Sequence, residues 1–145
     1  SRGLGDVYKR QAELRNFAEG RDIIVIDGKL RNEQKSISIS DRGQCAIVVD
    51  SKKITTRAEE TVIMAHELGH CETGAFYNER TLELRSRMEF RADKWAIKKL
   101  VTEDELIEAF ENGILEIWEL AEFFGVTEDF MVKVCELYGY YNRVI

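Results

Sequence analysis

Residues 66–70 read His-Glu-Leu-Gly-His, and this motif constrains the fold and chemistry of the chain more than any other feature. Residues four apart on an α-helix lie one above the other, so a helix here projects His66 and His70 from one face, where both imidazoles can hold one metal ion. Glu67 is one step round that helix, and its carboxylate can reach a water in an open coordination position. A buried helix with two stacked histidines is the alternative, but these are the only histidines in the chain. The motif therefore predicts a metal site on a helix, with Glu67 as general base.

Two imidazoles do not complete such a site, because a catalytic zinc ion usually has three protein ligands and one exchangeable water. The chain has no third histidine, so the missing ligand must be a carboxylate or a thiolate. Glu89 is the best candidate, since it falls on the next predicted helix with Asp93 four residues later on the same face. That face should otherwise be apolar, so two carboxylates there favour a site over a solvated surface. Asp93 could accept the spare N–H of a ligating imidazole and so fix its tautomer.

The chain is expected to fold as one α+β domain. Its 145 residues suit a single hydrophobic core. Three β-rich stretches precede the histidine motif, at 22–26, 36–40 and 45–49, and their spacing favours a small antiparallel sheet with a hairpin. Helices are predicted over 12–19, from Arg57 to about Gly74, over 82–100, and as three short amphipathic pieces between 103 and 138.

The first eleven residues, SRGLGDVYKRQ, show no hydrophobic period and are rich in glycine and basic side chains. They resemble the translation of a sequencing adapter, so we expect residues 1–11 to be a non-native or disordered segment. Residues 12–145 then form the single domain.

Cysteine usage and hydropathy bear on the compartment. Cys45, Cys71 and Cys135 are three in number, so they cannot all pair with one another. A reducing environment suits an odd number of thiols, and we predict a cytoplasmic protein in which each cysteine is a small buried hydrophobic residue. Cys71 points about 100° away from His70 round the helix, off the metal face. No apolar run approaches the about 20 residues that a membrane span needs.

The charge is distributed unevenly along the chain. Residues 100–145 contain eleven acidic residues against Lys133 and Arg143, which gives a net charge of −9. Such a surface repels phosphate backbones. Residues 119–130 imitate a helix-turn-helix, but the second helix carries Glu128 and Asp129 where DNA-reading helices place basic or amide side chains. We therefore expect no direct binding of nucleic acid.

The two helical motifs together resemble those of a known family. The HELGH motif, followed by the E-x-x-A-D-x-x-A pattern of residues 89–96, looks like the ImmA/IrrE-type metallopeptidases, including the small proteases of phages and mobile elements. The resemblance implies a zincin-like fold and a gluzincin-like site, with His66, His70 and Glu89 as metal ligands and Glu67 as base. It also implies a substrate class, the helix-turn-helix repressor proteins.

This reading predicts a zinc-dependent endopeptidase, although the ligand types also fit Mn²⁺. Glu67 would take a proton from the attacking water and pass it to the leaving amine. Tyr77 is the candidate for stabilising the oxyanion, with a packing role as its alternative. The strand 45–49 could be the edge along which an extended substrate adds. Rival hypotheses are a non-catalytic metal-binding, antitoxin-like module and an iron oxygenase with two histidines and one carboxylate, for which Glu67 has no evident role.

Overall fold

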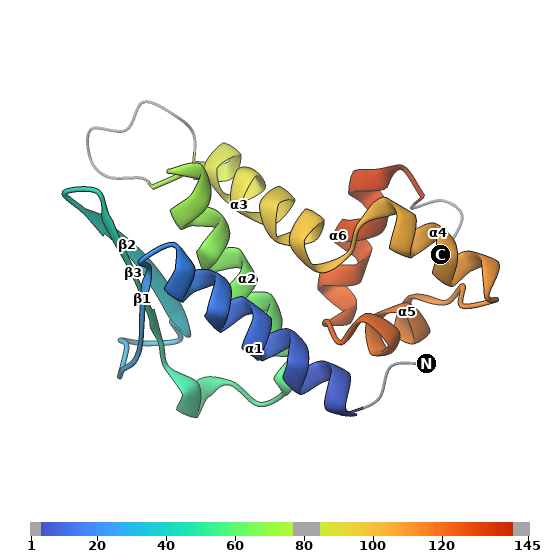
Figure 1. Ribbon diagram of the computed structural model, residues 1–145, viewed down its shortest axis with the longest axis horizontal. Helices are drawn as coiled ribbons and strands as arrows, with labels where there is room; N and C mark the ends of the chain where they lie inside the picture. The colour runs from blue at the N-terminus through green and yellow to red at the C-terminus, as the bar shows by residue number, and fades with distance from the viewer. Residues whose placement is uncertain (1–3, 77–84, 141–145) are drawn as a thin grey trace.

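The computed structural model describes residues 4–76 and 85–140 of the chain (Figure 1). Three strands and a helical layer make up its first part, and short helices make up its second. The strands are β1 (Ile24–Asp27), β2 (Ser36–Asp41) and β3 (Gln44–Val49), followed by a 3₁₀ turn at Ser51–Lys53. The helices are α1 (Leu4–Gly20), α2 (Arg57–Thr73), α3 (Arg85–Leu100), α4 (Glu103–Glu111), α5 (Ile117–Phe124) and α6 (Glu128–Tyr138). This α+β architecture agrees with the predicted zincin-like class.

The sheet is mixed rather than antiparallel. Its strand order is β1-β3-β2, with β1 parallel to β3 and β2 antiparallel to β3. The β2–β3 hairpin turns on Arg42 and Gly43, which both have positive φ, as a two-residue turn of the I′ type requires. The prediction of an antiparallel sheet was wrong for β1, because alternating hydrophobicity identifies a strand but carries no information about its direction.

One face of the sheet is covered by helices α1 and α2, as Figure 1 shows. Ile47 of β3 is fully buried there against a core to which Leu14 of α1 and Leu68 of α2 also belong. Burial of each such side chain contributes roughly 1.5–3 kcal/mol. This layer fixes α2, and with it the histidine motif, against the sheet.

Helix α1 begins at Leu4, so the predicted boundary near residue 12 was wrong and the segment 4–11 is helical. The guanidinium of Arg10 donates hydrogen bonds to the carbonyl oxygens of Leu100 at 2.7 Å and Phe124 at 3.1 Å. These carbonyls lie at the ends of α3 and α5, where a helix leaves its last acceptors without intrahelical partners. The prediction that the segment is non-native is a separate matter and stays a prediction.

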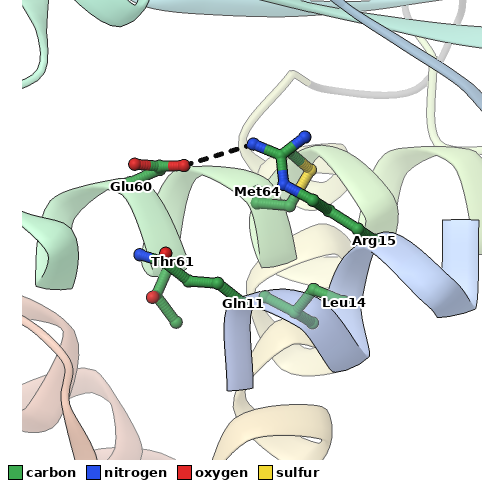
Figure 2. A pocket seen from close by; sticks show the side chains of 6 residues that line it. All are labelled: Gln11, Leu14, Arg15, Glu60, Thr61 and Met64. Atoms are coloured by element: carbon green, nitrogen blue, oxygen red, sulfur yellow. Dashed lines mark hydrogen bonds and ion pairs between the residues drawn. The ribbon is translucent and has the colours of Figure 1, made fainter. Parts of the chain in front are cut away.

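Figure 2 shows how α1 meets α2. Leu14 and Met64 are buried between the helices, and Arg15 pairs with Glu60 at 3.4 Å on the rim. Thr61 lies beside them at a cavity of about 10 Å³, and its buried hydroxyl has no hydrogen-bond partner among the residues that the structure describes. The contact thus has an apolar centre with polar side chains around it.

Two of the three cysteines are bonded to each other. A disulfide joins Cys45, on β3, to Cys71, on α2, with their Cα atoms 5.9 Å apart. The prediction of three reduced thiols was wrong for this pair. Cys71 does point away from the metal-binding face of α2, but that direction is toward the sheet, where Cys45 lies. Cys135 is a buried free thiol, as expected, and burial raises its pKa to about 11. The argument for a reducing compartment from an odd cysteine count therefore no longer holds.

The second half of the chain packs α4, α5 and α6 into the end of the same core, away from the sheet (Figure 1). Thr102 and Glu105 form a reciprocal capping box at the start of α4. Phe124 and Phe130, which border the helix-turn-helix-like turn, are both buried. No helix in the described part of the chain is long and apolar enough to cross a membrane.

Candidate metal centre and active site

Helix α2 carries the two histidines of the site, and a cap defines each of its ends. The hydroxyl of Thr56 accepts a hydrogen bond from the backbone N–H of Glu59 at the N-terminus, and Gly74 ends the helix in the left-handed region with φ of 66°. Between these caps, His66 and His70 project from one face. Their Nε2 atoms lie 3.2 Å apart.

Helix α3 brings Glu89 to the same point. Its Oε2 lies 2.8 Å from Nε2 of His66, and its Oε1 lies 3.2 Å from Nε2 of His70. Two imidazole nitrogens and one carboxylate thus converge, with all ligand atoms within 4.8 Å of one another. The structure brings together the three residues that the sequence analysis named as metal ligands.

The spacing of the two imidazole nitrogens fits a zinc ion. Two nitrogens bound at about 2.0–2.1 Å to a tetrahedral ion lie about 3.3 Å apart, which is close to the observed spacing of the two Nε2 atoms. Both Nδ1 atoms are already engaged elsewhere, so each imidazole has its Nε2 left for a metal. His66, His70 and Glu89 can therefore hold one divalent ion with coordination positions to spare.

The Nδ1 atom of each histidine has its own hydrogen-bond partner. Nδ1 of His66 lies 2.7 Å from Oδ1 of Asp93, and Nδ1 of His70 lies 2.6 Å from the carbonyl oxygen of Ala75. Both partners accept hydrogen bonds, so each imidazole carries its proton on Nδ1 and offers the lone pair of Nε2. Asp93 lies where the sequence analysis placed it.

Lys133, on α6, extends this network beyond what the sequence indicated. Its Nζ donates to Oδ2 of Asp93 at 3.1 Å. Burial would raise the pKa of Asp93, but the hydrogen bonds and charges of His66 and Lys133 outweigh it and lower that pKa. Burial would likewise lower the pKa of His66, but Asp93, with help from the charges of Glu67 and Glu89, raises it. Asp93 is thus held ionised beside His66.

Glu67 occupies the position expected of a general base, one residue after the first histidine. Its side chain is 6% exposed and borders the same cleft as the histidines. The hydroxyl of Ser36, on β2, donates a hydrogen bond of 2.5 Å to its Oε2. No sequence motif singles out Ser36, although the alternation Ser-Ile-Ser-Ile-Ser over residues 36–40 indicates that one face of β2 is polar.

A cleft of about 630 Å³ opens between β2 and the metal-binding face of α2. Residues 36–40 of β2 line one wall, and His66, His70 and Glu89 line the other, with Phe76 next to His70. The prediction that strand 45–49 is the substrate edge was wrong, because β3 is the central strand and β2 lies between it and the cleft. Tyr77, our candidate for stabilising the oxyanion, lies outside the described residues.

Comparison with known proteins identifies the family of this chain. The family model described as the IrrE N-terminal-like domain, Peptidase M78, matches residues 7–135. The chain belongs to this peptidase family. The match confirms the ImmA/IrrE resemblance seen in the HELGH and E-x-x-A-D motifs. The candidate metal cluster on α2 and α3 of this M78 domain lies inside the matched range. Neither the search of curated proteins nor that of solved structures found a match.

Proposed function

We propose that this M78 domain is a zinc-dependent endopeptidase that uses His66, His70 and Glu89 as metal ligands and Glu67 as general base. The observation that carries the proposal is the convergence of the three ligand atoms beside Glu67 in an open cleft. A metal alone would serve a structural role equally well. The cleft and the adjacent buried carboxylate are what favour catalysis over structure.

The side chains of the site divide the chemistry among them. A divalent ion held there would supply Lewis acidity, lowering the pKa of a water and polarising a substrate carbonyl. Glu67 would accept the proton of the attacking water on its carboxylate and donate it to the departing amine, so that no net proton is lost. His66 and His70 would keep their Nε2 lone pairs toward the metal because Asp93 and Ala75 hold the Nδ1 protons.

Strand β2 supplies the surface for an extended substrate. Within the part of the chain that the structure describes, β2 pairs with β3 alone, so its other edge faces the cleft with unpaired backbone groups. An extended peptide could add there as a further strand and lay its backbone across the metal site. This replaces the earlier expectation for strand 45–49 with its neighbour in the hairpin.

Helix-turn-helix repressors of phages or mobile elements are the proposed substrates, and the support for them is the family resemblance. The preferred metal is zinc, with Mn²⁺ as the competing ion. We retain a cytoplasmic location because such repressors act there, and we expect no direct contact with nucleic acid because residues 100–145 are strongly acidic.

Incubation with the helix-turn-helix repressor encoded beside the gene tests the proposal. Wild-type protein is compared with Glu67→Gln at equal metal content, each with and without a chelator. Glu67→Gln keeps the size of the side chain and all three ligands, so cleavage should fall at least about 10²-fold while the fold survives. Equal cleavage by both proteins would refute Glu67 as base. Repressor binding by both proteins with cleavage by neither would favour the non-catalytic module.

A further inference from the structure

We propose that Ser36 is a positioning residue for the general base, and that its hydroxyl holds the Glu67 carboxylate in the orientation used for proton transfer. This inference rests on the proposed peptidase function. The observation that supports it is the 2.5 Å hydrogen bond from Oγ of Ser36, on β2, to Oε2 of Glu67, on α2.

The backbone around Ser36 is fixed independently of Glu67. Ser36 pairs with Val49 in the β2–β3 register, so its side chain points to the same face as that buried valine. The carbonyl oxygen of the preceding Lys35 accepts a hydrogen bond of 2.8 Å from the backbone N–H of Asp50. The ammonium of Lys35 pairs with Glu59, in the first turn of α2, at 2.5 Å. The hydroxyl of Ser36 is therefore presented from a rigid support.

Glu67 needs such a partner because its side chain is long and buried. A glutamate has several rotatable bonds, and α2 fixes only the first of its atoms. A buried carboxylate is also costly unless it accepts hydrogen bonds. A hydroxyl donating to a carboxylate at this distance has the length of a charge-assisted bond. Ser36 thus meets both needs with one contact.

The chemistry of the donor suits a general base better than a cation would. A serine hydroxyl has one proton, so it engages Oε2 and leaves Oε1 of the same carboxylate to accept a proton. It adds no net charge that would compete with the water for Glu67. Because Ser36 also lies on β2, the strand proposed to bind substrate, it sets the position of the base relative to the substrate backbone.

The test compares Ser36→Ala with Ser36→Thr, which keeps the hydroxyl and suits a strand. Ser86→Ala, which removes a hydroxyl from an exposed position on α3, is the matched control. For cleavage of the repressor, Ser36→Ala should lower kcat by about 10²-fold, the loss expected when a reacting group is displaced by about 1 Å, with KM little changed. Ser36→Thr should recover most of kcat, and Ser86→Ala should match wild type. Metal content should be equal in all four proteins.

A second readout does not depend on cleavage. Crystal structures of the metal-loaded wild type and Ser36→Ala should show one Glu67 conformer in the first and a displaced or split carboxylate in the second, with His66, His70 and Glu89 unmoved. Unchanged kcat in Ser36→Ala, or an unmoved Glu67 carboxylate, would overturn the proposal. If the wild type binds metal but cleaves nothing, the proposed function fails, and the position of Glu67 in the two crystal structures still decides the role of Ser36.

Discussion

Gly69 of the histidine motif lies so close to Ala92 that a Cβ atom at Gly69 would overlap the Ala92 carbonyl oxygen. Helix α3 therefore crosses α2 at the one residue of the motif that has no side chain. Gly69 immediately precedes His70, and Ala92 is three residues after Glu89 on α3. The distance between the helices at this crossing sets the distance from Glu89 to the two imidazoles.

Replacing Gly69 by alanine should weaken the metal site without removing a ligand. The added methyl group pushes against backbone that cannot rotate away, and overpacking of this kind costs roughly 1–3 kcal/mol of unfolding free energy. We expect the affinity for Zn²⁺ to fall at least about tenfold, since small displacements of supporting groups cost metal sites that much. Competition with a chromogenic chelator measures the affinity, and chemical denaturation measures the stability.

The control for this substitution is Gly20→Ala. Gly20 is the last residue of α1, and a Cβ atom there would meet no atom within 4 Å. Alanine should be neutral or slightly stabilising at this position and should leave the zinc affinity unchanged. Equal zinc affinities for Gly69→Ala and wild type would show that the helix crossing does not define the site.

Loss of Glu89 should empty the site while the fold persists. Two imidazoles bind zinc much more weakly than a set of three protein ligands. Elemental analysis of purified Glu89→Ala should therefore find metal well below one ion per chain, whereas Glu111→Ala, which changes an exposed glutamate on α4, should retain wild-type content. Full occupancy in a folded Glu89→Ala would mean that another residue is the third ligand.

The pH dependence of metal binding should follow His66. Asp93 raises the pKa of His66 in the metal-free protein above the usual histidine pKa of about 6.5. The imidazole is therefore still partly protonated at a pH slightly higher than about 6.5. A ligating imidazole must be neutral, so zinc has to displace this proton. As the pH is lowered, the affinity for zinc should therefore begin to fall before the pH reaches about 6.5. Asp93→Asn removes the charge that raises the pKa, so the fall should move to lower pH. Titration calorimetry across pH 5.5–8 tests this, and identical pH profiles for the two proteins would contradict it.

Lys133 should affect the site less than Asp93 does. Asp93 touches a ligand directly, so Asp93→Asn should cost about 10- to 100-fold in zinc affinity. Within residues 4–76 and 85–140, Lys133 reaches the site only through Asp93, and its side chain is 55% exposed, so Lys133→Met should cost less zinc affinity than Asp93→Asn. The matched control is Lys98→Met on the exposed face of α3. A loss in Lys133→Met as large as in Asp93→Asn would mean that α6 holds the site more tightly than this geometry implies.

The sequence was sufficient for the parts of the site that are local. The spacing of His66 and His70 places both on one helix face, and the E-x-x-x-D spacing does the same for Glu89 and Asp93. Those pairs depend only on helical periodicity, which short-range patterns carry well. The caps at Thr56 and Thr102 are local features of the same kind, because a capping hydroxyl and its partner lie within one turn.

Contacts between distant segments could not be predicted from the sequence in the same way. Ser36 meets Glu67 across 31 residues, and Lys133 meets Asp93 across 40. Such contacts depend on the order of the strands and on how the helices cross. The hydrophobic repeats of strands and helices do not determine either of these. The parallel pairing of β1 with β3 and the Cys45–Cys71 bond also join segments that are far apart in the sequence.

Reduction of the Cys45–Cys71 disulfide should lower the stability of the domain. The bond closes a loop with a sequence separation of 26 residues, and the entropy model for a loop of that size gives about 3–4 kcal/mol of unfolding free energy. Denaturation with and without a reductant should show this difference in the wild type, whereas Cys45→Ser with Cys71→Ser should be insensitive to the reductant. Cys135→Ser serves as the control, because that thiol is free and buried, and this variant should keep the response to reductant. Two results together would show that the bond does not form. The denaturation curve of the wild type would be unchanged by reductant, and mass spectrometry would find three free thiols under oxidising conditions.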